Sequence, residues 1–487
     1  MPLGQIPDLI PILPELFLAL VVMALLMFGV FQKGGDKEID VKAFRIISWL
    51  SIISLIVALL LVMALPNRHL IAFNGLFLSD TYSVFCKILV MSGSAVTLII
   101  GQQFLERHDM ARFEYPVILV LATLGMLMMI SANDLISLYL GLELQSLSLY
   151  VIAAFRRDDT RSSEAGLKYF VLGAIASGLL LYGMSMIYGI TGSLDIGQIA
   201  AFATSANLNS DQVLILNFGL VFLVIGVAFK FGAVPFHMWV PDVYQGAPTS
   251  VTMFLSTVPK IAATAMLLRL LIDGLGALQA YWADLFMILA ILSIGLGSLV
   301  ALMQTNIKRL LAYSTISHIG FVMLGFVTGV VEGYGAAVFY VLAYVLMSLT
   351  AFGIIIVFNK QGFEADQIVD FRGLSKHSPW FALIMLFVML SMAGVPPFIG
   401  FYSKLFILQQ VISAGYVYLA VAAVVFAVIS AYYYLQIIKS MYFDDAEKEV
   451  TVSAPIDMRI ILSINGVLIL VLGLMPSYWM ELAISLF

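Results

Sequence analysis

Long apolar stretches separated by short polar stretches cover almost the whole chain. A helix needs about 20 mostly apolar residues to cross the hydrocarbon core of a membrane. By that measure the pattern predicts an all-α polytopic membrane protein with about 14 transmembrane helices. These segments cover roughly residues 9–32, 44–65, 80–102, 114–132, 134–155, 166–190, 212–245, 250–272, 278–303, 308–329, 334–358, 380–412, 416–441 and 460–485.

Lysine and arginine are distributed unevenly over the connections between these segments. If the chain crosses the membrane at each segment, the odd-numbered connections all open on one face. That face receives Lys33, Lys37, Lys42, Arg45, Arg107, Arg112, Arg156, Arg157, Arg161, Lys308, Arg309, Lys360, Arg372, Lys376, Lys439, Lys448 and Arg459. The opposite face, with both termini, receives only Arg68. Because Lys and Arg mark cytoplasmic loops, we expect both termini on the outer, periplasmic side of a bacterial plasma (inner) membrane.

Two of the segments are longer than one crossing requires, and each contains a Gly/Pro break. The first break, at 229–237, contains Pro235, and the second, at 393–398, contains Pro396 and Pro397. Proline inside a helix removes a hydrogen bond and clashes with the preceding turn. At membrane depth such backbone is stable only where protein or a wet cavity surrounds it.

The two breaks stand five segments apart, which suggests an internal repeat. Because five is odd, the second copy would enter the membrane from the opposite face, so we predict two inverted five-helix repeats with broken helices 7 and 12. Residues 1–487 then form a single integral membrane domain. Its predicted parts are peripheral helices 1–3 (1–112), a first repeat of helices 4–8 (113–273), an inverted second repeat of helices 9–13 (278–442) and helix 14 (459–487).

Composition agrees with a membrane protein and argues against several chemistries. Of the 487 residues, 62% are hydrophobic and 11% are charged, whereas a soluble domain carries about 25% charged residues. The one cysteine, Cys86, cannot form an internal disulfide or a Cys-ligated iron–sulfur site. No GxGxxG after a strand, P-loop or HExxH occurs. We therefore expect no cofactor and no metal in this chain, and no nucleic-acid partner.

Four ionisable residues interrupt the apolar segments: Glu143, Lys230, Lys260 and Lys404. Insertion scales put the cost of a charge at the helix centre at roughly 2.5–3.5 kcal/mol, so such residues are functional candidates. If segments five and seven adjoin, movement of Glu143 toward or away from Lys230 would switch that lysine between holding and releasing a proton. The alternatives are a structural carboxyl bonded to a neighbouring helix and a lysine that snorkels to the interface.

The other two lysines lie near prolines. Lys260 follows Pro259, which frees the carbonyl of Leu255 one turn back, and is a candidate for the centre of a relay. Its alternative role is to bind freed carbonyls and so stabilise the kink. Lys404 lies about two turns after Pro397 in the outer half of the membrane and is the candidate exit station, with outward snorkelling as the alternative.

Further relay candidates are His237, His318 and Lys168. Imidazole titrates near neutral pH, although a lone histidine is often a satisfied core residue. Lys168 and Lys87 lie near the ends of segments six and three, where snorkelling is the competing interpretation.

The chain resembles the antiporter-like membrane subunits of respiratory complex I in four runs: GLELQSLSLY at 141–150, PFHMWVPDVYQGAP at 235–248, QTNIKRLL at 304–311 and SHIG at 317–320. Membership implies a fourteen-helix fold with two inverted repeats, a glutamate–lysine pair on helices 5 and 7, a central lysine on helix 8 and a terminal charged residue on helix 12. These positions fall on Glu143, Lys230, Lys260 and Lys404.

Among the paralogues of this family, the chain looks most like the subunit N family of bacterial NADH:quinone oxidoreductase. It stops after segment fourteen, unlike subunit L, and has Lys404 where subunit M has a glutamate. The resemblance implies proton translocation coupled to quinone reduction, with other membrane and peripheral subunits, lipids and protons as partners. FMN, iron–sulfur clusters and quinone are then expected in the partner subunits.

Two rival functions remain open from the residues alone. One is a subunit of a multisubunit sodium/proton antiporter; sodium prefers oxygen ligands, and the pattern places only Glu143 deep in the membrane. The other is a structural spacer subunit, in which buried charges only lock helices together. The spacer predicts assembly defects, rather than pumping defects, when the lysines change.

Overall fold

The computed structural model describes residues 9–32, 34, 37–65, 69–205, 209–359, 364–445 and 454–487. Within them, 13 helices are long and apolar enough to cross a membrane. The chain is therefore a multi-pass membrane protein. Four basic residues used above to assign the faces, Lys33, Arg68, Lys360 and Lys448, lie outside the described residues.

Twelve of the predicted segments contain one long helix each, or most of one. They are α1 (Leu13–Gln32), α2 (Lys37–Ala64), α3 (Thr81–Arg107), α4 (Glu114–Ser131), α5 (Leu135–Ala153), α6 (Thr160–Thr191), α8 (Ser210–Phe231), α12 (Gln279–Ala301), α13 (Ile307–Val327), α14 (Val331–Phe358), α18 (Val417–Tyr442) and α19 (Ile456–Leu474). The predicted segment 250–272 is built from α10 (Thr249–Ser256), α11 (Val258–Leu267) and the π-helix η3 (Leu268–Gly274).

The helix is interrupted at both predicted breaks. Helix α8 ends at Phe231, and the short helix α9 (Trp239–Gly246) follows; the segment 380–412 consists of α16 (Pro379–Ala393) and α17 (Ile399–Ser413). Each first half ends at a glycine in the left-handed conformation, Gly232 with φ +76° and Gly394 with φ +89°. Glycine adopts this conformation without a steric penalty, and the prolines that follow cannot continue the helix.

Several short elements were not predicted from the pattern. They are the antiparallel strands β1 (Leu70–Ala72) and β2 (Phe77–Ser79), the helices α7 (Ile196–Ala203), α15 (Leu374–His377) and α20 (Pro476–Ile484), and the 3-10 turns η1 (Ile10–Ile12), η2 (Phe73–Gly75), η4 (Gly276–Leu278) and η5 (Ile368–Phe371). Backbone bridges from Phe77 to Ala132 and from Asp134 to Asp195 tie the connections at one end of the bundle together.

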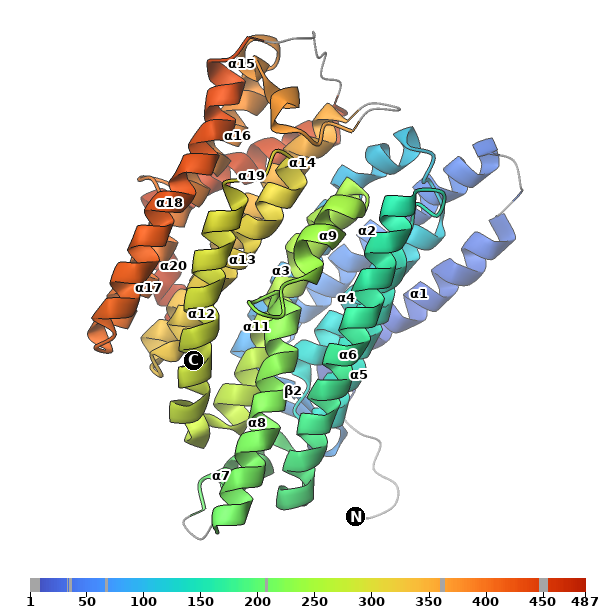
Figure 1. Ribbon diagram of the computed structural model, residues 1–487. Coiled ribbons are helices and arrows are strands. Elements are labelled where there is room, and N and C mark those ends of the chain that lie inside the picture. The colour runs from blue at the N-terminus through green and yellow to red at the C-terminus, as the bar shows by residue number, and fades with distance from the viewer. Residues whose placement is uncertain are drawn as a thin grey trace.

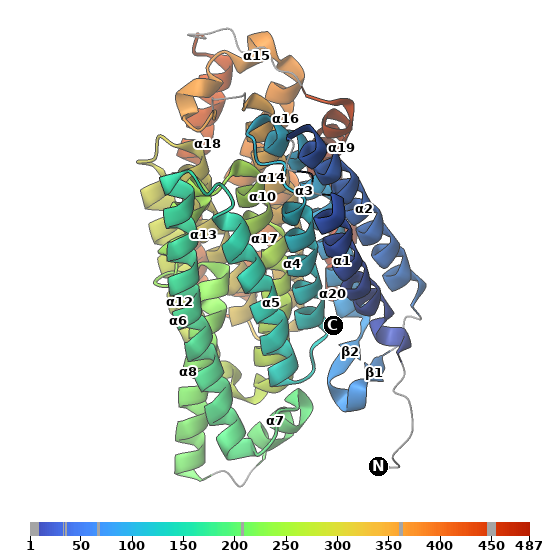
Figure 2. The same cartoon turned by 90° about the vertical axis from the view of Figure 1, so that its right-hand side faces the viewer.

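The helices run roughly side by side along the long axis of the molecule (Figure 1). Turned by 90°, the same bundle has α1 and α2 on one side, away from α12 and α13 (Figure 2). The best-buried spans lie in the middle: the most apolar stretch of Thr249–Gly274 is 100% buried and that of Ile307–Val327 is 94% buried, against 28% for α18. Lys260 and His318 sit on these two central spans.

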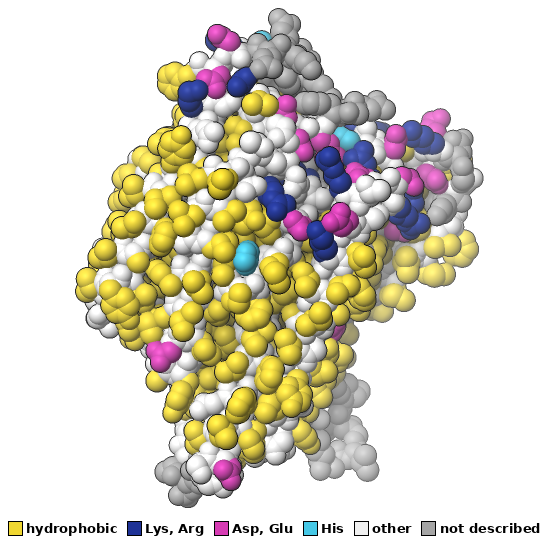
Figure 3. All heavy atoms as spheres, in the orientation of Figure 1, with side chains coloured by type: hydrophobic (Ala, Val, Ile, Leu, Met, Phe, Trp, Pro, Cys, Tyr) yellow, Lys and Arg dark blue, Asp and Glu magenta, His cyan; other side chains and the backbone are white. Residues whose placement is uncertain are grey.

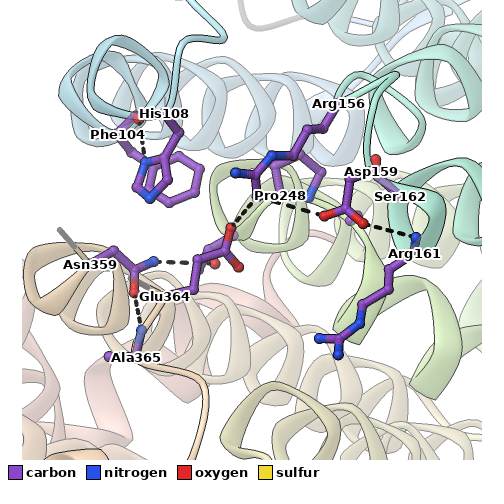
Figure 4. A network of polar contacts seen from close by, with 12 residues as sticks. Phe104, His108, Arg156, Asp159, Arg161, Ser162, Pro248, Asn359, Glu364 and Ala365 are labelled. Carbon is purple, nitrogen blue, oxygen red and sulfur yellow. Dashed lines mark hydrogen bonds and ion pairs between the residues drawn. The ribbon is translucent and has the colours of Figure 1, made fainter. Parts of the chain in front are cut away.

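Charged side chains gather at one end of the bundle. On the face shown in Figure 3, hydrophobic side chains form a broad belt, and most Lys and Arg side chains lie above it, toward the end that carries α15. Ion pairs join the odd connections there: Lys37 lies 2.6 Å from Asp109, and Arg156 lies 2.9 Å from Glu364. Figure 4 shows Arg156 between Asp159 and Glu364. The odd connections that these contacts join thus share one face, as the alternation of basic residues requires.

Candidate functional site

Glu143 lies in the middle of α5 and is half-buried. Its Oε1 accepts a hydrogen bond from the Ser177 hydroxyl on α6, and the same hydroxyl lies 3.1 Å from the hydroxyl of Tyr139. The carboxyl therefore has a neutral partner on a neighbouring helix. A neutral donor of this kind leaves the charge of the carboxyl available to a nearby cation.

Lys230 lies in the last turn of α8, and its Nζ donates a hydrogen bond of 2.6 Å to the Ser146 hydroxyl on α5. Ser146 is three residues after Glu143, close to one helical turn away on the same helix. Among the described residues, the contact from Lys230 to α5 runs through Ser146, and no direct ion pair joins Lys230 to Glu143. The predicted adjacency of segments five and seven is confirmed by this hydrogen bond.

Lys260 is 1% exposed and binds the broken end of α8. Its Nζ donates to the carbonyl oxygens of Lys230, at 3.2 Å, and Phe231, at 3.1 Å. The ammonium also lies 5.2 Å from the centre of the Trp239 ring. The last carbonyls of a helix carry partial negative charge, so a cation is stabilised there. The carbonyl of Leu255, which Pro259 frees, is not the partner of Lys260. The carbonyl oxygens of Lys230 and Phe231 accept its hydrogen bonds instead.

Lys404 repeats this arrangement at the second break. It is 7% exposed, and its Nζ donates to the carbonyl oxygens of Met392, at 2.8 Å, and Ala393, at 3.2 Å. These are the last two carbonyls of α16, just as Lys260 binds the last two of α8. Outward snorkelling of Lys404 is therefore wrong, since the side chain turns back to the helix end, where the carbonyl dipoles are stronger partners than a distant interface.

His318 is 3% exposed and is bonded on both ring nitrogens. Nδ1 lies 2.8 Å from the hydroxyl of Tyr340, and Nε2 lies 3.0 Å from the hydroxyl of Tyr434. The Tyr434 hydroxyl is 2.5 Å from that of Ser314, one turn before His318 on α13. Neither tyrosine was a candidate from the sequence, because a tyrosine inside an apolar segment is compatible with simple helix packing. The signal for one of them was the run Tyr432-Tyr433-Tyr434 within a predicted span.

The remaining relay candidates, His237 and Lys168, differ in their polar contacts. His237 is half-buried between α8 and α9, and its Nδ1 finds no partner in the described part of the chain. Lys168 is 41% exposed and is held by Glu164, at 2.7 Å, and Asp242, at 2.8 Å. Asp242 is also held by Arg309 at 2.8 Å. Lys168 thus belongs to a charged cluster of α6, α9 and α13, where these four side chains line a cavity of about 300 Å³.

Lys87 does not snorkel to the interface. It pairs with a buried carboxylate, Glu15, that the sequence pattern did not single out. Its Nζ lies 2.6 Å from Oε1 of Glu15, and the two side chains are 0% and 3% exposed. Glu143 is therefore not the only carboxylate buried among the spans. Glu15 stands in the first turn of α1, where the pattern shows only the start of an apolar run.

The described residues contain no group of three or more His, Cys, Asp or Glu side chains placed to hold a metal ion. The site is instead a set of single ammonium, carboxyl, imidazole and hydroxyl groups. They can take up, hold and release protons.

Comparison with known proteins agrees with this architecture. The family model described as "NADH:quinone oxidoreductase/Mrp antiporter, TM" matches residues 132–430. A relative from Ruthia magnifica named NADH-quinone oxidoreductase subunit N is 60% identical over 98% of this chain and 97% of its own. The relative of the same name from Thioalkalivibrio sulfidiphilus is 48% identical over 98% of each.

Solved structures show the same fold. A chain of respiratory complex I from Thermus thermophilus is 31% identical, with a TM-score of 0.81 over 96% of this chain and 98% of that one. A chain of the Mrp complex from a Dietzia species is 19% identical, with a TM-score of 0.79 over 98% and 97%, and so shows the fold alone. The chain therefore belongs to the NADH-quinone oxidoreductase subunit N family, within the wider family of complex I and Mrp antiporter membrane subunits.

Proposed function

We propose that this chain is a proton-translocating membrane subunit of NADH:quinone oxidoreductase, in which protons move along a buried axis from Glu143 and Lys230 through Lys260 to Lys404. Quinone reduction takes place in partner subunits, which carry the FMN and iron–sulfur clusters. The chain sits in the bacterial inner membrane with both termini on the periplasmic side. Its partners are the other membrane and peripheral subunits, and membrane lipids.

The observation that carries this proposal is the matched binding of two buried lysines at two broken helices. Lys260 and Lys404 each hold the last two carbonyls before a left-handed glycine. A lysine that only braces a helix end needs a permanent charge. Helix-end carbonyls attract an ammonium less strongly than a carboxylate does, so a lysine held by carbonyls alone can exchange its proton, whereas one paired with a carboxylate keeps it. The inverted repeats proposed at 113–273 and 278–442 are supported by the two breaks themselves, whereas Lys260 lies on the segment after its break and Lys404 on the broken segment itself.

Contacts join the groups of the proposed axis in two sets, one around Lys230 and Lys260 and one around His318 and Lys404. Lys260 is bonded to the backbone of Lys230, whose side chain is bonded to α5 beside Glu143. On the far side, Lys404 lies 5.6 Å from the Phe321 ring. Phe321 stacks on Tyr340 with ring centres 5.9 Å apart, and Tyr340 is bonded to His318. These contacts bring His318 close to Lys404, and this supports the proposal that His318 passes the proton from the central lysine to the exit lysine.

In the proposed mechanism, a signal from the quinone end changes the position or the charge of Glu143. Weaker attraction to Glu143 lets Lys230 release its proton, which passes through water and His237 to the central Lys260. The proton then moves by way of His318 to Lys404 and leaves at the outer face. Electrostatic attraction between buried charges is strong, because little water screens it.

Substitution of Lys230 in the assembled complex tests the proposal. We expect Lys230→Ala to assemble and to lose most NADH-driven proton pumping in membrane vesicles, while Lys439→Ala, on an exposed lysine at a helix end, pumps normally. Full pumping in a correctly assembled Lys230→Ala complex would refute the proposal. Loss of assembly without a pumping defect in the complexes that form would favour the structural spacer. Transport that depends on sodium and needs no NADH would favour the antiporter.

A further inference from the structure

A small enclosed cavity lies between α5, α8, α9 and α11, at the first half of the proposed axis. Its volume is about 10 Å³, and the residues that line it include Gln145, Lys230, Trp239 and Lys260. That volume is of the order that one water molecule occupies. Among the described residues lining it are both lysines, whereas His237 is absent from them.

Gln145 is the amide side chain among the residues that line this cavity, which also include Tyr169. It is 3% exposed, and its Oε1 accepts no hydrogen bond from the described part of the chain. Buried side-chain oxygens nearly always have a partner in the protein or in ordered water. Gln145 lies on α5 between Glu143 and Ser146, the residue that binds Lys230, so it is next to the first two groups of the proposed axis.

Both lysines have ammonium N–H donors that do not take part in hydrogen bonds to the described part of the chain. An ammonium group carries three donors. Lys230 uses one on Ser146, and Lys260 uses two on the carbonyls at the end of α8. Each therefore keeps at least one donor for a molecule in the cavity, and a water needs about two to four polar partners to be held in a protein interior.

We propose that Gln145 is a positioning residue, which holds one water molecule between Lys230 and Lys260 through a hydrogen bond to its Oε1. The ammonium of Lys230 gives a proton to this water as the water gives one of its own to the neutral amine of Lys260. Lys230 ends neutral, Lys260 ends charged, and the water is unchanged. This inference rests on the proposed function, and it replaces His237 by a water in the step between these two lysines.

The test compares Gln145→Met, which keeps the length of the side chain and removes both polar ends, with Gln145→Asn, which keeps a neutral amide oxygen as acceptor. Gln198→Met, on an exposed residue of α7, is the matched control. We expect Gln145→Met to pump about tenfold more slowly in the assembled complex, the factor that corresponds to one lost hydrogen bond, while Gln145→Asn recovers part of the rate and the control retains all of it. The solvent deuterium isotope effect on pumping should change in Gln145→Met alone, which a purely structural role would not cause.

The outcomes separate this inference from the proposed function. Normal pumping in Gln145→Met together with loss of pumping in Lys230→Ala would overturn the role of Gln145 only. Normal pumping in both would overturn the proposed function as well. If Gln145→Met does not assemble, a high-resolution map of the unaltered complex decides: density for a water within hydrogen-bonding distance of Gln145 Oε1 supports the inference, and a cavity closed by side chains refutes it.

Discussion

The buried ion pair of Glu15 and Lys87 allows a quantitative prediction that does not depend on the relay. Both side chains are almost fully buried, at 3% and 0% exposure, and lie 2.6 Å apart. The ammonium also lies 4.6 Å from the centre of the Phe77 ring. No further hydrogen-bond partner of either charged group occurs in the described part of the chain.

Removing one partner leaves the other charge buried and unpaired. Such a change typically costs about 3–5 kcal/mol, whereas replacing both partners by apolar residues of similar volume is often neutral. We therefore expect Lys87→Met and Glu15→Leu each to destabilise the folded chain by about 3–5 kcal/mol, and the double variant to recover most of that loss.

The assay is the fraction of this chain that stays folded and bound to the purified complex during a temperature ramp. The matched control is the exposed pair of Lys42 and Glu38 on α2, whose side chains are 68% and 77% exposed. Lys42→Met should have little effect, because solvent screens exposed pairs. Equal effects of Lys87→Met and Lys42→Met, or a double variant no better than the single ones, would refute the reasoning. Pumping per assembled complex should stay normal in the double variant.

Three further predictions concern the axis itself. Ser146→Ala removes the hydroxyl that Lys230 binds at 2.6 Å, so pumping should fall severalfold while Ser148→Ala, on the same helix, stays near normal in the same vesicle assay. Tyr434→Phe removes a partner of His318 at 3.0 Å and should slow pumping without loss of assembled complex, as measured by complex content against pumping rate. Gly394→Ala places a Cβ at φ +89° and 3.2 Å from the Lys404 side chain, and should destabilise the end of α16 by about 1–2 kcal/mol in a thermal ramp.

Most of the membrane-spanning architecture could be predicted from the hydrophobic pattern. The length of an apolar segment is a local property, and the bilayer requires that length whatever the neighbouring helices are. Predicted segment 114–132 became Glu114–Ser131, and 416–441 became Val417–Tyr442. The hairpin of β1 and β2 and the helix α7 were not predicted, because contacts with distant connections stabilise elements that are too short to be stable alone.

The four ionisable candidates were also visible in the sequence, because a charge inside an apolar run is conspicuous and costly. Their partners were not. Nothing in the pattern around Lys404 indicates that its side chain turns back to Met392 and Ala393 instead of extending to the interface. Glu15 gives no such signal, because it lies near the start of a span, where a carboxylate is usually solvated.

The sequence by itself determined which segments cross the membrane, where two of them break and which residues carry charge into the interior. Only the tertiary structure decided that Lys260 and Lys404 bind equivalent helix ends, that two tyrosines flank His318 and that Gln145 shares a cavity with two lysines. The physical reason is the range of the interactions. Span length and helix breaks depend on neighbouring residues in the chain, whereas the partner of a buried polar group depends on which helices pack against it.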